Sequence, residues 1–339
     1  MDLDALNATA EKMVTPGKGL LAADESTSTI QKRFDAIGVE NTEKNRRDYR
    51  EILFRSEEGM AYVSGVILFR ETLYQDAADG TPLVQLIERA GAVPGIKCDE
   101  GAKPLALFPG ETITEGLDGL GPQLAKDYER GARFAKWRAT ILIGGGRPTW
   151  SAIKANAHAL ARYAAICQDN GITPIVEPEV LMDGDHDIEA CEAATRLTLR
   201  EVFEELAIQR VALEGMVLKP NMVISGQDCL AQASVEEVAR RSIATYKACV
   251  PAAVPGIAFL SGGQSDELAT AHLNAMNQLG PLPWKLTFSY GRALQHAPQQ
   301  AWCGKPENAA AAQRAFTHRA RMNSLASLGK WEGALEKAA

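Results

Sequence analysis

Eight short apolar runs recur along the chain, and segments of helix length separate them. This alternation is typical of parallel βα units, in which a helix covers each buried strand. Eight is also the number of strands that closes a (β/α)8 barrel. The regular spacing and the absence of a low-complexity linker predict an α/β TIM barrel formed as one domain over residues 1–339. The runs are 19–24, 63–69, 93–99, 134–138, 173–179, 216–222, 256–263 and 286–291.

The segments between the runs are rich in Ala, Leu, Glu and Arg, which favour helices. A last helix-rich stretch, 307–328, ends at Gly329-Lys330-Trp331. We expect it to pack outside the barrel, so that helical segments extend the barrel at its N- and C-terminal ends and residues 329–339 form a tail. The best helix candidates are 41–55, 123–131, 152–168, 190–206 and 235–248.

The balance of charge argues against two classes of partner. The formal net charge is -7, whereas binding to nucleic acid or to an anionic membrane surface needs a basic field. Met1-Asp2-Leu3-Asp4 does not begin a signal peptide, and no run approaches the ~20 apolar residues of a membrane span. We therefore expect a cytoplasmic protein that binds neither nucleic acid nor membrane.

Cysteine and histidine spacing gives no sign of a metal. The six cysteines form no C-x-x-C and the five histidines no H-E-x-x-H. Asp183-Gly184-Asp185-His186-Asp187 resembles a calcium loop, but Ile188 stands where that loop needs glycine. We interpret it as a loop and helix cap, and expect neither a metal nor a cofactor.

Charged side chains close the apolar runs. Side chains at i and i+2 of a strand share a face, so each charge-x-charge pair places two charges on one side of the sheet. Any single one of them could be a solvated strand-end charge, but burying the set costs several kcal/mol unless its members pair. Strand C-termini are where barrel enzymes build their active sites. The charges are Asp24, Lys97, Asp99, Lys136, Arg138, Glu177, Glu179 and Lys219.

Lys219 is the candidate nucleophile. Pro220 follows it and favours an extended conformation, as expected at a strand end. A lysine attacks a ketone only in its neutral form, which burial and neighbouring cations such as Lys136 and Arg138 favour.

The last two runs end in glycine turns. Ser261-Gly262-Gly263 and Ser289-Tyr290-Gly291-Arg292 each lead into a helix, where backbone N–H groups favour an anion. Strands seven and eight are also the usual position for phosphate in a barrel. The two turns therefore predict a phosphate site.

Seven motifs, in order from about Lys12 to Leu328, resemble class I fructose-1,6-bisphosphate aldolase. They are Leu21-Ala22-Ala23-Asp24-Glu25-Ser26, Gly95-Ile96-Lys97, Phe134-Ala135-Lys136-Trp137-Arg138, Val176-Glu177-Pro178-Glu179, Leu218-Lys219-Pro220-Asn221-Met222, Ser261-Gly262-Gly263-Gln264 and Ser289-Tyr290-Gly291-Arg292.

The resemblance implies a metal-independent carbon–carbon lyase of glycolysis and gluconeogenesis that cleaves fructose 1,6-bisphosphate into dihydroxyacetone phosphate and glyceraldehyde 3-phosphate. It implies that Lys219 forms the Schiff base, that Glu177 is its acid/base, and that Asp24 and Lys136 flank the breaking bond, with Glu179 beside them. It assigns one phosphate to Ser261, Gly262, Gly263, Gly291 and Arg292, with Ser289 in the same motif, and places Ser26, Arg33, Lys97 and Arg138 toward the other.

Two departures from the family pattern matter. Animal members end in a tyrosine that assists proton transfer, whereas no tyrosine follows Tyr290 here. The family's Ser-Thr-Gly-Ser is Ser26-Thr27-Ser28-Thr29, which loses the glycine. The resemblance also implies a homotetramer. A Schiff-base aldolase that prefers fructose 1-phosphate or another ketose phosphate, and a non-catalytic barrel used as a binding scaffold, stay open as alternatives.

Overall fold

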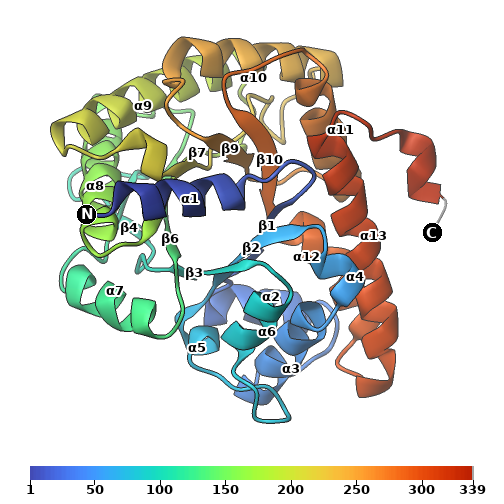
Figure 1. Cartoon of the computed structure of the whole chain (residues 1–339). Coiled ribbons are helices and arrows are strands. Elements are labelled where there is room, and N and C mark those ends of the chain that lie inside the picture. Colours follow the sequence, from blue (N-terminus) through green and yellow to red (C-terminus); the bar gives the residue numbers. More distant parts are fainter. Residues whose placement is uncertain (338–339) are drawn as a thin grey trace.

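Eight parallel strands close into a barrel, which confirms the predicted α/β TIM barrel (Figure 1). The computed structural model describes residues 1–337, so the last two residues of the predicted tail, Ala338 and Ala339, lie outside it. Around the barrel the order is β1-β10-β9-β8-β7-β6-β3-β2. The strands are β1 (Gly19–Ala23), β2 (Val63–Leu68), β3 (Val93–Lys97), β6 (Phe134–Ile141), β7 (Thr173–Val180), β8 (Val217–Leu218), β9 (Gly256–Phe259) and β10 (Lys285–Tyr290).

Helices surround the barrel (Figure 1). Within residues 1–337, none of them is long and apolar enough to cross a membrane. The larger ones are α1 (Leu3–Met13), α2 (Thr27–Asp35), α3 (Glu43–Phe54), α6 (Leu83–Arg89), α7 (Leu120–Glu129), α8 (Trp150–Asp169), α9 (Ile188–Ile208), α10 (Val235–Cys249), α11 (Asp266–Asn277), α12 (Arg292–Trp302) and α13 (Ala309–Ser327), and α4 (Glu57–Met60) and α5 (Arg70–Leu73) are single turns.

Several expected features are confirmed and others were missed. All five candidate helices form within a few residues of their expected bounds. Asp187 caps α9 by accepting a hydrogen bond from Ala190 N at 2.8 Å, as the loop-and-cap interpretation of that segment requires. Sequence patterns did not reveal the antiparallel hairpin of β4 (Ala102–Pro104) and β5 (Thr112–Thr114), because each strand has only three residues and those of β4 are exposed.

Alternate residues of each strand form two separate cores. Leu21, Ala23 and Trp137 pack outward under the helices, and Cys98 belongs to the same outer core. Leu20, Ala22 and Ile67 point into the barrel. Because every second side chain of a strand points the same way, Leu20, Ala22 and Asp24 all face the barrel interior. The first two fill the core, and Asp24 places a charge at the mouth of the barrel.

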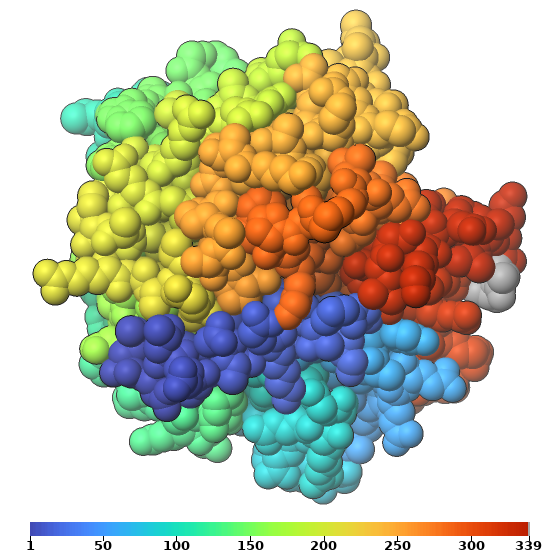
Figure 2. Space-filling model, turned by 45° about the horizontal axis from the view of Figure 1, so that its top comes forward, coloured from blue at the N-terminus to red at the C-terminus, as the bar shows by residue number. Residues whose placement is uncertain are grey.

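Helix α1 closes the N-terminal end of the barrel. Its Ala10 and Met13 are fully buried against inward strand residues such as Phe134. Thr173 Oγ1 donates to Leu6 O at 3.0 Å, and Asn7 Nδ2 donates to Glu214 O at 2.9 Å. Figure 2 shows this helix, in dark blue, lying across one face of the molecule. The barrel interior therefore has a solid apolar floor beneath its charged mouth.

Two glycines make room for the ring of Phe134 on that floor. A Cβ added to Gly95 would lie 2.2 Å from the ring, and one added to Gly65 would lie 3.1 Å from it. Gly95 therefore has a packing reason to lack a side chain, because close-packed interiors have no spare volume.

A polar chain ties α11 to the turn that follows β9. Gln264 Nε2 donates to Ser261 O at 3.0 Å, and the Gln264 amide oxygen accepts from His272 Nδ1 at 2.6 Å. His272 is 3% exposed, and burial lowers its pKa to about 4. The turn is therefore held by a neutral histidine.

The replacement Gly95→Ala should destabilise the barrel by about 1–3 kcal/mol, because the new methyl group forces Phe134 out of its position. Urea unfolding measures this effect. Gly121→Ala in α7 is the matched control, since a Cβ there meets its nearest neighbour at 3.6 Å and alanine favours a helix. Equal midpoints for the two variants would show that Gly95 is not a packing requirement.

The free energy of unfolding should fall as pH drops from about 6.5 to 4. In this range His272 binds a proton in the unfolded state but stays neutral in the folded state. This difference between the unfolded and folded pKa values of His272 corresponds to about 3 kcal/mol of stability. In urea unfolding across this pH range, His272→Asn should flatten the profile, while His296→Asn, at an exposed position, should leave it unchanged. The same slope in wild type and His272→Asn would contradict the assignment.

Candidate active site

A cavity of about 770 Å³ opens at the C-terminal end of the barrel. Residues in or just after β1, β2, β3, β6, β7, β8, β9 and β10 all contribute to its lining. Eight basic and six acidic side chains line it, in a chain whose net charge is -7. The cavity is thus the local cationic pocket that an anionic ligand needs in an acidic protein.

Lys219 is positioned by the strand before it, although β8 has only two residues. Its backbone N–H donates to Val176 O at 2.8 Å, which continues the pairing with β7 beyond the end of β8. Val217, two residues earlier, packs in the barrel interior, so alternation turns Lys219 inward as well. The lysine side chain is 5% exposed and lines the cavity.

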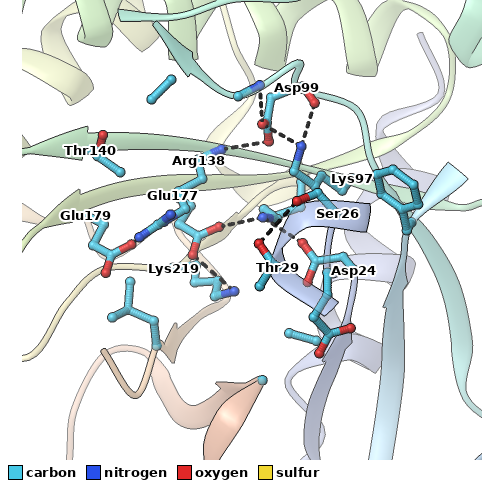
Figure 3. A pocket seen from close by; sticks show the side chains of 18 of the residues that line it. Asp24, Ser26, Thr29, Lys97, Asp99, Arg138, Thr140, Glu177, Glu179 and Lys219 are labelled. Carbon is cyan, nitrogen blue, oxygen red and sulfur yellow. Dashed lines mark hydrogen bonds and ion pairs between the residues drawn. The ribbon is translucent and has the colours of Figure 1, made fainter. Parts of the chain in front are cut away.

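Four charges of alternating sign cross the cavity floor. Lys219 Nζ lies 3.1 Å from Glu177 Oε1, and Glu177 Oε2 lies 3.3 Å from Lys136 Nζ. Lys136 Nζ is also 2.8 Å from Asp24 Oδ2. Figure 3 shows Glu177 next to Lys219, with Asp24 on the opposite side of the cavity. We call Lys219, Glu177, Lys136 and Asp24 the charge chain.

The charge chain keeps Asp24 and Lys136 ionised. Burial alone raises the pKa of Asp24, but the positive charges of Lys136, Lys219 and Lys97 outweigh it and hold that pKa far below its usual value. Burial likewise lowers the pKa of Lys136, and the carboxylates of Asp24, Glu177 and Asp99 more than reverse this. A carboxylate that stays ionised beside a fixed ammonium can accept a proton from a substrate hydroxyl.

Two further ion pairs extend from the charge chain toward the hairpin side of the cavity. Arg138 Nε donates to Glu179 Oε2, and Lys97 Nζ lies 2.7 Å from Asp99 Oδ1. Asp99 also accepts from the backbone N–H groups of Arg138 at 3.3 Å and Gly101 at 3.1 Å. These contacts fix both cations along the cavity wall.

The ends of β9 and β10 supply the second group of polar residues. Ser261, Gly262, Ser289 and Gly291 line the cavity, and Gly262 takes a left-handed φ of 56°. The Ser289 hydroxyl is buried and has no hydrogen-bond partner within residues 1–337. Arg292 lines the cavity too, where its Nη2 donates to the carbonyls of Gly263 and Gln264 at 2.6 Å.

The structure does not bring every predicted residue to the same place. Gly263 does not line the cavity, because its N–H points to Met182 Sδ. Arg33 lines it near the β10 end, since a Cβ added to Gly291 would lie 3.6 Å from Arg33 Nη2. All the other predicted site residues line the cavity: Asp24, Ser26, Lys97, Lys136, Arg138, Glu177, Glu179, Lys219, Ser261, Gly262, Ser289, Gly291 and Arg292.

A buried network behind Asp24 holds Arg33 in place. Glu25 is 6% exposed and accepts from Arg33 Nη1 and from Gln295 Nε2, the latter at 2.6 Å. Arg50 Nη2 donates to Glu25 O at 3.0 Å, and Gln295 Nε2 also donates to Ala22 O at 2.6 Å. The network joins the end of β1 to α2, α3 and α12, so it fixes the backbone that carries Asp24.

Ser26 N-caps α2 and contacts two further hydroxyl groups. Ser26 Oγ lies 3.1 Å from both Ser28 Oγ and Thr29 Oγ1, and all three residues line the cavity. Ser28 occupies the position at which the resemblance expects glycine, and its hydroxyl joins the cluster. The departure thus adds a polar group at the start of α2.

Sequence reasoning missed several lining residues, most of them with charge or a hydroxyl group. Arg70 follows directly after the run 63–69, so the strand-end rule could have found it. Lys103 and Thr140 lie on the unexpected hairpin and on the extended end of β6, which no pattern signalled. Within residues 1–337 no group of three or more His, Cys, Asp and Glu gathers as a metal site. The missed residues include Glu25, Ser28, Thr29, Arg70, Glu100, Lys103 and Thr140.

Comparison with known proteins places this geometry in a family. The model of the family described as class-I fructose-bisphosphate aldolase matches residues 5–339. A probable class 1 fructose-bisphosphate aldolase of Xanthomonas campestris pv. campestris is 57% identical over 334 residues, which cover 98% of this chain and 100% of that protein. Cytosolic fructose-bisphosphate aldolase 4 of Arabidopsis thaliana is 54% identical over 329 residues, covering 97% of this chain and 84% of that protein.

A solved structure agrees. Fructose-bisphosphate aldolase from Plasmodium falciparum, in a ternary complex with TRAP and a small-molecule inhibitor, superposes with a TM-score of 0.97 at 49% identity, covering 98% of this chain and 96% of that one. These matches confirm the resemblance carried by the seven motifs and support neither a preference for fructose 1-phosphate nor a scaffold role. The chain belongs to the class-I fructose-bisphosphate aldolase family.

Proposed function

We propose that this aldolase reversibly cleaves fructose 1,6-bisphosphate into dihydroxyacetone phosphate and glyceraldehyde 3-phosphate, with Lys219 as the nucleophile. The observation that supports this most directly is the charge chain, in which a buried lysine contacts Glu177, and Glu177 contacts a second lysine that holds Asp24. The arrangement supplies a nucleophile, a proton carrier beside it and a second base across the cavity.

Imine formation uses Lys219 and Glu177. The neutral amine of Lys219 attacks the C2 ketone, and the carbinolamine then loses its oxygen as water. Glu177, whose Oε1 lies 3.1 Å from Lys219 Nζ, is within reach to take the amine proton and to protonate the departing hydroxyl. The product is a protonated imine, which withdraws electrons from C3.

Bond cleavage uses Asp24. Its ionised carboxylate takes the proton of the C4 hydroxyl, the C3–C4 bond breaks, and the electron pair moves into the imine as an enamine. Glyceraldehyde 3-phosphate leaves. Water then delivers a proton to C3 of the enamine while Asp24 gives its own proton back to water, and hydrolysis of the imine releases dihydroxyacetone phosphate and regenerates Lys219. Lys136 keeps Asp24 ionised until it takes the proton of the C4 hydroxyl.

The two ends of the cavity suit the two phosphates. Ser261, Gly262, Ser289, Gly291 and Arg292 lie at the ends of β9 and β10, next to β8, so they suit the phosphate on C1 beside the imine carbon. Arg33 belongs with this group because it lies beside Gly291. Ser26, Lys97 and Arg138 lie on the walls formed by β1, β3 and β6 and suit the phosphate on C6. Glu179 acts by holding Arg138.

We propose further that the chain acts as one domain, in the cytoplasm, as a homotetramer that needs neither metal nor cofactor. The cytosolic name of the Arabidopsis relative supports the compartment. Light scattering on a size-exclusion column tests the tetramer, and a mass near that of a monomer would exclude it.

Borohydride reduction in the presence of dihydroxyacetone phosphate should leave a stable adduct on Lys219, because reduction traps the imine where it forms. Peptide mass spectrometry identifies the modified residue. Lys219→Met should form no adduct, while Lys12→Met on α1 is the control and should label like wild type. Loss of activity with a chelator, and no adduct, would contradict the Schiff-base mechanism.

Asp24→Asn should lower kcat by about 10²–10⁴-fold, since an amide cannot accept the hydroxyl proton. The same variant should still form the borohydride-trapped adduct, because Glu177 and Lys219 remain. Glu177→Gln should instead slow adduct formation itself. If Asp24→Asn abolished the adduct but left the fold intact, Asp24 would act in imine formation and not in bond cleavage.

A further inference from the structure

Arg70 lies at the mouth of the cavity and has no part in the reaction described above. It begins α5, with Phe69 between it and the end of β2. In the barrel β2 lies between β1 and β3, and its register pairs Leu68 with Ile96, so the chains leave these strands side by side. Arg70 is therefore on the same side of the cavity as Lys97.

A buried carboxylate anchors Arg70. Asp127 on α7 is 0% exposed, and its Oδ1 accepts from Tyr74 OH and from Gln123 Nε2, each at 3.0 Å. Its Oδ2 is left for Arg70 Nη2, at the long distance of 3.4 Å. Two neutral donors thus fix the carboxylate, and the carboxylate keeps the guanidinium of Arg70 at the cavity mouth.

The anchor leaves most of the donors of Arg70 unused. A guanidinium carries five N–H donors, and the structure records one weak bond from this one. The Arg70 side chain is 39% exposed, and its Nε is buried with no hydrogen-bond partner within residues 1–337. A small shift of the guanidinium toward a ligand would therefore cost only the weak bond to Asp127, and it would let the free N–H donors find partners.

Lys97 and Arg138, the two cations assigned above to the C6 phosphate, already have close ion-pair partners. Lys97 is bonded to Asp99 at 2.7 Å, and Arg138 to Glu179. A planar guanidinium with free donors binds a phosphate through two parallel hydrogen bonds, which a lysine cannot do. Arg70 is thus the better placed of these groups to recognise a phosphate that enters at the mouth.

We propose that Arg70 is a specificity-determining residue that binds the C6 phosphate and favours sugar bisphosphates over monophosphates. The proposal rests on the proposed function. Fructose 1-phosphate has the same C1 phosphate, ketone and C3–C4 bond as the bisphosphate but no phosphate on C6. The ratio of kcat/KM for the bisphosphate to kcat/KM for fructose 1-phosphate therefore isolates the contribution of Arg70.

The test is this ratio in purified Arg70→Met. It should fall on the order of 10–100-fold, the effect of losing a charge-assisted hydrogen bond to phosphate. Most of the fall should appear in KM for the bisphosphate. Arg70→Lys should restore part of the ratio, because it keeps the charge and loses the two-pronged geometry. A structural disturbance would lower kcat/KM for both substrates alike.

Two further variants guard against a folding effect. Arg130→Met removes a neighbouring cation that stacks on Tyr74 at 5.0 Å and does not line the cavity, so it should keep the wild-type ratio. Arg70→Met leaves Asp127 buried without its cation, which lowers stability. The double variant Arg70→Met/Asp127→Asn removes that charge, so it should recover the melting temperature while the ratio stays low.

Failure of the Arg70 proposal can be distinguished from failure of the proposed function. A wild-type ratio in Arg70→Met, or recovery of the ratio in the double variant, would overturn the role of Arg70 while leaving the aldolase function intact. A wild-type protein that did not cleave fructose 1,6-bisphosphate would overturn the proposed function and this inference with it.

Discussion

The site depends on the two ion pairs that Glu177 makes, one with Lys219 and one with Lys136. Each of Lys136, Glu177 and Lys219 is at most 5% exposed, and an isolated charge at such a position would be strongly destabilising. The alternation of sign from Lys219 to Asp24 makes the burial tolerable, because every member has an opposite charge within 3.3 Å. The fold can therefore hold Lys219 and Glu177 in contact, and in the function proposed above this places the amine beside its proton carrier.

The packed floor supports this arrangement from below. Phe134 fills the space over Gly95 and Gly65, and Lys136 follows on the same face of β6. An apolar layer directly beneath a set of charges excludes water on that side and strengthens the interactions among them. Packing and chemistry thus come from successive inward positions of the same strand, so a change in one disturbs the other.

Strand alternation is the reason that much of the site could be predicted from the sequence. The pairs at 97/99, 136/138 and 177/179 sit at the ends of apolar runs, where local geometry alone decides which way they point. The places of Arg33 and Gly263 could not be predicted in this way, because they depend on contacts with residues distant in the sequence. Arg33 lies near Gly291, and Gly263 contacts Met182. Arg70 depends on Asp127, a residue 57 positions away that no local pattern connects to it.

Helix α1 precedes every strand of the barrel in the sequence, yet its docking is completed late. The hydrogen bonds that seat it on the barrel join Leu6 to Thr173 and Asn7 to Glu214, across 167 and 207 residues of chain. Closure of the barrel itself waits for β10 to meet β1, where Leu20 pairs with Ser289. Contacts of such long range make barrel closure intrinsically slow. The nascent chain exposes its apolar α1 face to chaperones, or to other chains, until most of the protein has emerged.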